Sequence, residues 1–336
     1  MVRLSSDGVD GWGEATPGDA PLYSPEWAGA AYNTIKDFFL PKLLGEEIDS
    51  AADLMNRLAM FKGNPFAKSA VDFAWWALHS KLEGKPLWRV LGGEEPMVPC
   101  GAAFGIQDTI DELLSLIQKV VDAKWQRIKL KVCHGWDIEM LAAVRATFPN
   151  TVFHVDCNSD YDLTEDIETL RAFDRFHLAM IEQPLAHTDL IEHAELQKQI
   201  ETPVCLDESI KSPRDFRLAL KIGACRVVNV KPGRVGGLHH AIQIHDMAKE
   251  AGIKAWVGSM LETNIGTGIC VALATLPGFT YPSDIAVGFH KEGITERQVE
   301  INESHYAILG ETPGTGFEPV PEKLDAVTLR REAFGD

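Results

Sequence analysis

Charged residues end five short apolar runs in the middle of this 336-residue sequence. Their positions rise by 25, 26, 25 and 24 residues along the series Lys131, Asp156, Glu182, Asp207 and Lys231. Buried strands rarely keep a charge without a partner or a function. One such residue is commonly a solvated loop charge or an ion pair, but five at one spacing indicate a shared site. Their types suit a metal-binding acidic cluster with two lysines able to transfer protons.

The spacing between these charges fits a repeat of one strand plus one helix. Eight segments can be the strands of this repeat: 98–104, 127–132, 152–156, 179–182, 204–207, 227–231, 254–257 and, most weakly, 278–281. Short apolar runs that alternate with amphipathic stretches are typical of parallel βαβ units. Eight units favour an α/β fold, a closed (β/α)8 barrel of the TIM type, whose active-site face lies at the carboxyl ends of the strands. We therefore expect the five charges to meet in one cavity.

The N-terminal part of the chain has a different pattern. Turn pairs predict a strand or a hairpin within residues 4–12, and helical apolar spacing follows at 25–44, 50–61 and 65–83. We predict an α+β capping domain built from residues 1–92 and from a C-terminal segment, 301–336, that returns to it. The barrel would then occupy residues 93–300.

Side-chain alternation along the strands predicts which residues face the cavity. Lys129 and Lys131 share one face of their strand, while the apolar residues between them face the helices. The same alternation within 227–231 places Asn229 and Lys231 together on the inner face. We therefore expect three lysines at the mouth of the barrel.

The three carboxylates need a neutralising charge if they converge. Asp156, Glu182 and Asp207 would otherwise repel one another and raise one another's pKa. A divalent cation resolves this repulsion, and all-oxygen ligation favours Mg²⁺, with Mn²⁺ as a second choice, over zinc. Octahedral Mg²⁺ with three carboxylate ligands keeps about three positions for water or for a substrate carboxylate.

The lysines would offset the remaining negative charge and transfer protons. A lysine base needs its pKa lowered from about 10.4 to roughly 7 or 8, and a metal and neighbouring ammonium groups act in that direction. Lys131 and Lys231 approach the cavity from opposite sides. A base on each face of a planar enolate allows proton removal on one side and delivery on the other.

Composition limits the classes of partner. The chain has 49 acidic and 32 basic residues, a net charge of -17 that opposes binding to nucleic acid or to anionic membranes. No apolar run approaches the length of about 18 residues expected of a membrane span, and no signal peptide is indicated at the start. Six scattered cysteines without a C-x-x-C pair are typical of reduced core residues. We expect a cytoplasmic homo-oligomer that acts on a small carboxylate.

Five motifs in this order resemble the enolase superfamily, in its muconate lactonizing branch. They are Lys129-Leu130-Lys131, Asp156-Cys157-Asn158, Ile181-Glu182-Gln183-Pro184, Leu206-Asp207-Glu208-Ser209 and Val230-Lys231-Pro232-Gly233. The resemblance implies Mg²⁺ on Asp156, Glu182 and Asp207. It also implies Lys131 and Lys231 as the acid/base pair and Lys129 as support for the enolate charge; superfamily sites pair a Lys or His base with Mg²⁺. Further residues would contact the substrate or support those that do: Asn158, Asn229, Arg234, Glu208, Ser259 and Glu262.

Within that branch the segments 231–237 and 259–263 are most similar to o-succinylbenzoate synthases and N-acylamino acid racemases. The resemblance implies abstraction of a proton α to a carboxylate through an enediolate, followed by syn dehydration in the menaquinone pathway or by racemisation. A muconate cycloisomerase or a dipeptide epimerase is the alternative within the branch. Mandelate racemases carry a histidine that 256–264 lacks, and dipeptide epimerases carry an Asp-x-Asp pair of which only Asp284 is present.

Two hypotheses of other classes stay open. A lone lysine at the end of a barrel strand can form a Schiff base, so Lys231 could belong to a lyase. The chain could also be a non-catalytic binding descendant, because relatives begin with a further strand and a specificity loop upstream of Trp12-Gly13-Glu14 that is expected to be missing here.

Overall fold

Seven parallel strands form the central sheet of the computed structural model, which describes residues 1–285, 287–290 and 293–335. In spatial order the strands are β4 (Ala102–Phe104), β5 (Ile128–Lys131), β6 (Phe153–Asp156), β7 (Ile181–Glu182), β8 (Val204–Leu206), β9 (Val227–Val230) and β10 (Lys254–Val257). The sheet curls so that residues 279–284 bridge both of its edges. Phe279 and Asp284 pair with the β10 side, and Ser283 pairs with Cys100 just before β4. The expected barrel architecture is confirmed.

The first and eighth predicted strands differ from expectation. Segment 98–104 is divided between β4 and β3 (Met97–Pro99), which joins a separate antiparallel sheet with β12 (Tyr306–Ile308) and β11 (Glu300–Ile301). Segment 278–281 makes only isolated bridges. Prolines explain both departures, because Pro99 lies within the first segment and Pro277 and Pro282 flank the last, and proline cannot donate to a strand ladder.

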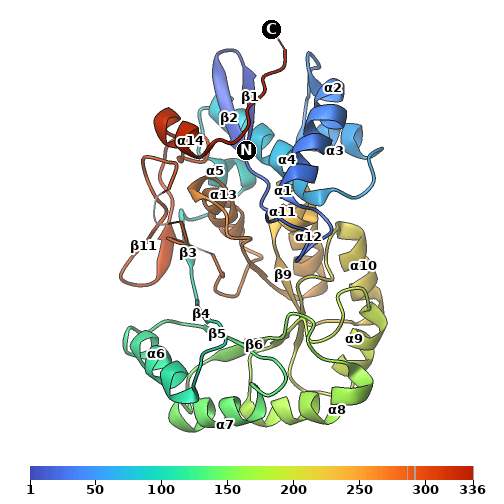
Figure 1. Ribbon diagram of the computed structural model, residues 1–336, viewed down its shortest axis with the longest axis vertical. Coiled ribbons are helices and arrows are strands. Elements are labelled where there is room, and N and C mark those ends of the chain that lie inside the picture. Colours follow the sequence, from blue (N-terminus) through green and yellow to red (C-terminus); the bar gives the residue numbers. More distant parts are fainter. Residues whose placement is uncertain (286, 291–292, 336) are drawn as a thin grey trace.

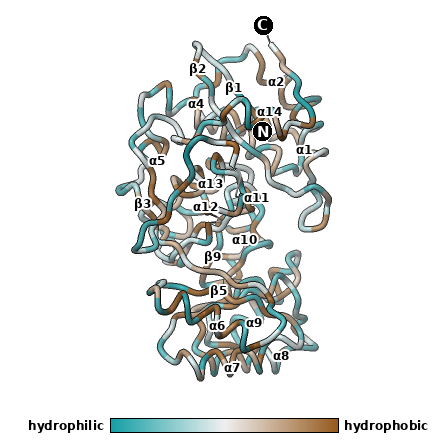
Figure 2. Tube along the Cα trace, turned by 60° about the vertical axis from the view of Figure 1, so that its left-hand side comes forward, coloured by the Kyte–Doolittle hydropathy of each residue, from teal (hydrophilic) through white to brown (hydrophobic). Residues whose placement is uncertain are grey.

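Helices follow the barrel strands and cover the outside of the sheet (Figure 1). They are α6 (Ile110–Asp122), α7 (Ile138–Thr147), α8 (Leu163–Ala172) with the 3₁₀ turn η2 (Phe173–Phe176), α9 (Leu190–Gln197), α10 (Pro213–Ile222), α11 (Pro232–Val235), α12 (Leu238–Ala251) and α13 (Asn264–Ala274). Most begin at a side chain that accepts a backbone N–H, as Thr109 does for α6 and Ser212 for α10. Hydrophobic and hydrophilic stretches alternate along α6 to α9 (Figure 2), so one side of each helix packs inward.

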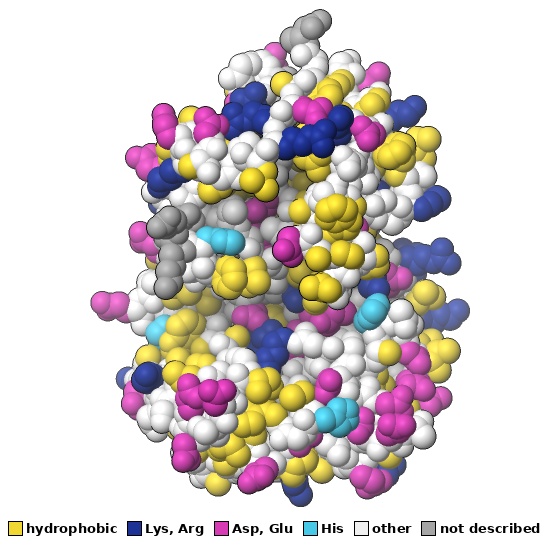
Figure 3. All heavy atoms as spheres, viewed as in Figure 1, with side chains coloured by type: hydrophobic (Ala, Val, Ile, Leu, Met, Phe, Trp, Pro, Cys, Tyr) yellow, Lys and Arg dark blue, Asp and Glu magenta, His cyan; other side chains and the backbone are white. Residues whose placement is uncertain are grey.

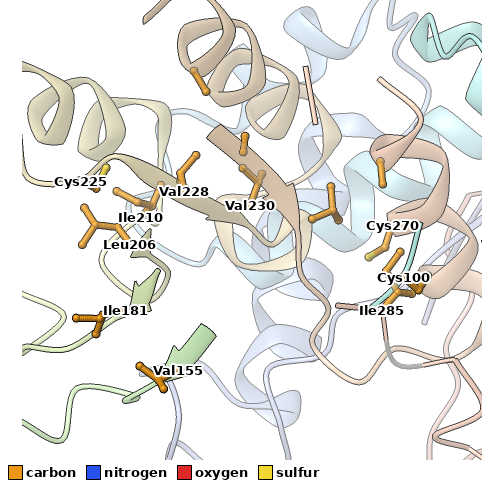
Figure 4. Packing of buried hydrophobic residues seen from close by; sticks show 14 of the residues in the cluster. Cys100, Val155, Ile181, Leu206, Ile210, Cys225, Val228, Val230, Cys270 and Ile285 are labelled. Carbon is orange, nitrogen blue, oxygen red and sulfur yellow. The ribbon is translucent and has the colours of Figure 1, made fainter. Parts of the chain in front are cut away.

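Apolar side chains of successive strands form the layer between sheet and helices. Figure 4 shows this packing, in which Val155, Ile181, Leu206, Val228 and Val230 are all fully buried. The residues that alternate with them on the same strands include the predicted site residues. The alternation of each strand therefore separates core from cavity, as predicted.

The N-terminal elements form a separate layer above the barrel (Figure 1). They are an antiparallel pair, β1 (Val2–Ser6) and β2 (Val9–Gly13), followed by α1 (Ala28–Thr34), the π-helical turn η1 (Ile35–Phe39), α2 (Leu40–Leu43), α3 (Ala51–Leu58), α4 (Pro65–Leu82) and α5 (Leu87–Leu91). The long helix α4 packs closely on β2. A Cβ atom at Gly13 would lie 2.2 Å from the Ala70 carbonyl oxygen, so only glycine permits this approach. We call residues 1–91 the cap.

The C-terminal segment, with α14 (Pro321–Val327), lies beside the cap (Figure 1). Glu318 forms an ion pair of 2.7 Å with Lys81, and Glu332 pairs with Lys36 at 3.1 Å. The domain boundaries at residues 92 and 300 stay a prediction. Within the described residues, no helix combines the length and apolar character needed to cross a membrane.

Candidate active site

The three predicted metal ligands lie at the carboxyl ends of neighbouring strands. Asp156 ends β6, Glu182 ends β7 and Asp207 directly follows β8. The register places Asp156 beside Lys131 on one side and beside Glu182 on the other. All three carboxylates are buried, with residue exposures of 2%, 0% and 0%. The fold therefore places these three acids next to one another at the carboxyl ends of the strands, as predicted.

Lys129 is surrounded by carboxylates. Its Nζ lies 3.2 Å from Asp156 Oδ2, 3.7 Å from Glu182 Oε2 and 2.5 Å from Asp284 Oδ2. Burial opposes its charge, but the charges of Asp284, Glu182 and Asp156 outweigh burial and raise the pKa of Lys129 well above its usual value. Lys129 is therefore a fixed positive charge.

Lys131 lies on the same face of β5, nearer to solvent. Its Nζ donates to Asp156 Oδ2 at 2.9 Å and to the side-chain oxygen of Asn158, and 36% of its side chain is exposed. Asn158 in turn donates to Glu208 Oε1 at 2.8 Å. Asp156 and Asn158 thus hold Lys131 on one side of the site, and Glu208 holds Asn158.

Lys231 lies on the other side, just after β9. Its Nζ forms an ion pair of 2.9 Å with Asp207 Oδ2 and lies 5.6 Å from the centre of the Tyr23 ring, and 12% of its side chain is exposed. Burial opposes its charge, but Asp207 outweighs burial and raises the pKa of Lys231. The sequence favoured a lowered lysine pKa, and the ion pair with Asp207 accounts for the difference.

Arg234, in the short helix α11 that follows Lys231, pairs with Asp207. Its Nη1 lies 2.6 Å from Asp207 Oδ1 and donates to the Tyr23 hydroxyl at 3.1 Å, while its Nε donates to the Ile210 carbonyl oxygen. Burial would raise the pKa of Asp207, but the charges of Arg234 and Lys231 hold it well below its usual range. Arg234 therefore acts through Asp207.

Glu182, like Asp207, is fully buried. Asn229 Nδ2 donates to its Oε1 at 2.8 Å, and His154 Nε2 lies 3.4 Å from its Oε2. Burial, and next the charge of Asp156, raise the pKa of Glu182 to about 8. Positive charge beside Glu182 would restore its ionised form.

The donor set fits a hard divalent cation. Three buried acceptor oxygens, Glu182 Oε2, Glu208 Oε2 and Asn229 Oδ1, accept no hydrogen bond from the residues that the structure describes. Oxygen ligands of this kind suit Mg²⁺ or Mn²⁺. As the side chains lie, lysines stand among the acids, and no group of three or more His, Cys, Asp or Glu within the described ranges is arranged to hold a metal. The metal ligands therefore stay a prediction.

Glu262 and Ser259 follow β10. Glu262 is buried, and its Oε2 accepts the Met260 backbone N–H at 2.8 Å. Burial raises the pKa of Glu262 to about 7, and the charge of Glu14 from the cap acts in the same direction. Ser259 is half-buried beside this turn, and its role stays a prediction.

Two residues of the site were not among the predicted ones. Asp284 contacts Lys129 from the closing segment, and its position after the weak eighth strand is the signal that could have found it. Tyr23 reaches Lys231 and Arg234 from a cap loop that has no repeat pattern, so nothing in the sequence indicates that contact.

A cavity of about 680 Å³ lies between cap and barrel beside Arg234 and Glu208. Its wall includes Tyr23 and Phe66 from the cap and Lys211 from the barrel. Figure 3 shows basic and acidic side chains close together in the hollow between the upper and lower parts of the molecule. The arrangement can bind a small anionic molecule that has an apolar portion.

The family comparisons agree with the two parts of the structure. Residues 1–92 match the family described as "Mandelate racemase / muconate lactonizing enzyme, N-terminal domain". Residues 112–323 match the family "Enolase C-terminal domain-like".

Similar proteins include an N-succinylamino acid racemase of Thermus thermophilus, which is 40% identical over 96% of this chain and 84% of its own length. An o-succinylbenzoate synthase of Bacillus subtilis is 39% identical over 99% of this chain and 90% of its own length. Similar solved structures include a member of the enolase superfamily from Listeria innocua, with a TM-score of 0.92 and 33% identity, covering 96% of this chain and 87% of that one. A muconate cycloisomerase of Pseudomonas fluorescens has a TM-score of 0.89 at 26% identity, covering 96% of this chain and 92% of that one.

The predicted resemblance is confirmed, since both family matches and both kinds of relative agree with it. Because the matches cover the cap and the barrel together, this chain belongs to the enolase superfamily, in its mandelate racemase and muconate lactonizing group of enzymes.

Proposed function

We propose that this protein removes a proton α to a carboxylate with Lys131 and Lys231, as an o-succinylbenzoate synthase, an N-succinylamino acid racemase, or both. One observation carries the proposal: two lysines approach a row of three buried carboxylates from strands at opposite sides of the sheet. Relatives of both names at about 40% identity support the substrate class.

The placement of the two lysines defines what each can do. Lys131 comes from β5 and Lys231 from the end of β9, so a planar enediolate between them would present one face to each ammonium group. Racemisation requires a proton donor and acceptor on both faces. A syn elimination requires proton transfer on one face only. The same two residues can therefore serve both named reactions, and loss of each lysine distinguishes them.

We propose that Asp156, Glu182 and Asp207 hold Mg²⁺, or Mn²⁺ in its place. When bound, the cation would supply positive charge that stabilises the substrate carboxylate and its enediolate. Lys231 shares the carboxylate of Asp207 with that site, so its pKa would fall once its ion pair is weakened. Lys129, pinned by Asp284, adds a positive charge that does not titrate near neutral pH.

The direct test is α-proton exchange of an N-succinylamino acid in D₂O, followed by proton NMR with Mg²⁺ and with excess EDTA. We expect exchange that is lost with EDTA and restored by Mg²⁺. Formation of the aromatic product from the o-succinylbenzoate precursor can be followed in parallel by absorbance. Exchange that persists with EDTA, or in the Lys131→Ala/Lys231→Ala double variant, would contradict the proposal.

The alternatives have less support. For a Schiff-base lyase, Lys231 would need a neutral amine, whereas its ion pair with Asp207 raises its pKa. For a dipeptide epimerase, Asp284 would have to be free for substrate, but it binds Lys129; the second position of that motif, Ala286, lies outside the described residues. A non-catalytic descendant would have no reason to keep all three lysines and all three acids. Homo-oligomer assembly and cytoplasmic location stay predictions.

A further inference from the structure

A carboxylate of the cap lies against the barrel helix that follows Lys231. Asp72, on the inner side of α4, is fully buried. Its Oδ2 accepts the backbone N–H of Leu238 at 2.6 Å. Leu238 is the first residue of α12, so Asp72 caps a helix that belongs to the other part of the molecule.

The helix α12 has no capping side chain of its own. Its N-cap residue is Gly237, with φ +116°, and a Cβ atom there would lie 2.4 Å from Asp72 Oδ2. A serine or aspartate at position 237 is excluded for this reason. Asp72 therefore occupies the place where a local cap would lie.

Only six residues separate Lys231 from the capped amide of Leu238. Lys231 is the N-cap of the short helix α11, and its carbonyl oxygen accepts the N–H groups of Arg234 and Val235. The Gly237 N–H then bonds back to the Pro232 carbonyl oxygen at 2.9 Å. Backbone hydrogen bonds thus connect the Lys231 backbone with the residue next to the Asp72 contact.

The cap contacts this loop at further points. Gly233 lies against Phe66 and Thr16, since a Cβ atom there would meet their side chains at 3.6 and 3.8 Å. The Phe66 and Thr16 contacts are apolar or loosely directed. The directed contacts between the cap and this loop are the Arg234–Tyr23 hydrogen bond, on a side chain, and the Asp72–Leu238 hydrogen bond, which holds the backbone. The loss of its acceptor would leave the Leu238 N–H buried and unpaired, and the loop would shift to satisfy that donor.

We propose that Asp72 is a positioning residue. It holds the loop of residues 231–238, and with it Lys231, in the position required for proton transfer. The proposal rests on the proposed function, in which Lys231 serves one face of the enediolate. Asp72 touches neither Lys231 nor substrate and acts through the backbone of residues 231–238. Proton transfer is sensitive to misplacement, and a displacement of about 1 Å can cost about 10²-fold in rate.

The test compares Asp72→Ala with Asp72→Asn and with a matched control. Asn keeps an oxygen that can accept from Leu238. The control is Asp174→Ala, because Asp174 likewise accepts backbone N–H groups of a distant segment, from Glu201 at 2.9 Å and from Thr202 at 2.8 Å, but before β8 at the opposite end of the barrel. Exchange of the α-proton in D₂O is measured for each enantiomer of an N-succinylamino acid, after Lys131→Ala and Lys231→Ala have shown which enantiomer depends on which lysine.

We expect Asp72→Ala to slow exchange of the Lys231-dependent enantiomer by about 10- to 100-fold. The other enantiomer should change by less than about threefold, Asp72→Asn should recover most of the rate, and Asp174→Ala should leave the ratio between enantiomers unchanged. An equal loss for both enantiomers, or no loss in Asp72→Ala, would overturn the positioning role.

Amide hydrogen exchange gives a readout that does not depend on turnover. Asp72→Ala should raise amide exchange in residues 231–240 and leave residues 131–137 unchanged. If the wild-type protein exchanges no α-proton, the proposed function fails, and this measurement still decides on the contact: unchanged protection of 231–240 overturns its role in holding the loop, and increased exchange supports it.

Discussion

The two lysines on either side of the row of acids are held in different ways. Lys131 is half-exposed and is held by Asp156 and Asn158, both of which belong to the next strand and its loop. Lys231 is nearly buried, and its partners extend from Asp207 through Arg234 to Tyr23 of the cap. One base therefore depends on local barrel geometry, and the other depends on how the cap and the barrel fit together.

This difference suggests how one barrel can serve related reactions. The barrel alone supplies Lys131, the row of acids and Lys129. The environment of Lys231 can change with cap residues such as Tyr23 while the barrel stays the same. We infer that the residues around Lys231 set the balance between syn elimination, which needs proton transfer on one face, and racemisation, which needs it on both faces.

Removal of either lysine should have the largest effect. We expect Lys131→Ala and Lys231→Ala each to reduce racemisation by about 10²- to 10⁴-fold, the range for loss of a general acid or base. Syn elimination should depend on only one of the two to this extent. Chiral chromatography of an N-succinylamino acid measures racemisation, and absorbance of the dehydration product measures elimination. If both variants kept the same residual activity in both reactions, the two lysines would not have the different roles proposed here.

The next effect concerns stability. Arg234→Ala leaves the buried Asp207 without one of its two cations, and breaking a buried ion pair costs about 3–5 kcal/mol of unfolding free energy. Lys131→Ala removes a half-exposed partner of Asp156, for which we expect about 1 kcal/mol or less. Urea unfolding of the two variants tests this difference. Similar losses of unfolding free energy would show that the Asp207 and Asp156 ion pairs contribute equally to stability.

The cap contact beside Lys231 should give a pH-dependent stability. Burial raises the pKa of Asp72 from 3.8 to about 8, and the backbone donors of Leu238 and His239 only partly oppose this. Because the folded protein binds the Asp72 proton more tightly than the unfolded chain does, this group stabilises the folded state fully below pH 4. That contribution to the free energy of unfolding is lost as the pH rises toward 8. The stability of the wild type relative to Asp72→Asn should therefore fall between pH 4 and pH 8 in urea unfolding; a constant or rising difference contradicts this sign.

The smallest effect is expected on the Lys131 side. Asn158→Ala removes the hydrogen-bond acceptor for Lys131 and the donor to Glu208, but Asp156 still holds the ammonium group. We expect a rate loss of about tenfold or less, confined to the enantiomer that depends on Lys131. A loss of 10³-fold in the exchange assay would mean that Asn158 contacts the substrate directly.

The strand ends were predictable because they follow from two periodicities. The repeat of about 25 residues placed Asp156, Glu182 and Asp207 at neighbouring strand ends, and the alternation within Lys129 to Lys131 placed both lysines on the inner face. Both inferences need only local geometry and the symmetry of a barrel.

The remaining contacts depend on packing between distant segments. Asp284 lies in a segment where prolines interrupt the strand pattern, so its position after the weak eighth strand is its one local signal and does not indicate the contact with Lys129. Tyr23 contacts the barrel from the loop between β2 and α1, and Asp72 contacts it because α4 lies on α11 and α12. The raised pKa of Lys231 likewise follows from a specific ion pair that spacing does not define.

Enantiomer-resolved exchange tests the central claim, that one lysine serves each face of the substrate, most directly. Each enantiomer of an N-succinylamino acid is incubated in D₂O with Mg²⁺ and the wild type, Lys131→Ala or Lys231→Ala, and loss of the α-proton signal is followed by NMR. The predicted result is complementary: each variant loses exchange of one enantiomer and keeps exchange of the other. Loss of the same enantiomer in both variants, or full exchange of both enantiomers in either one, would contradict it.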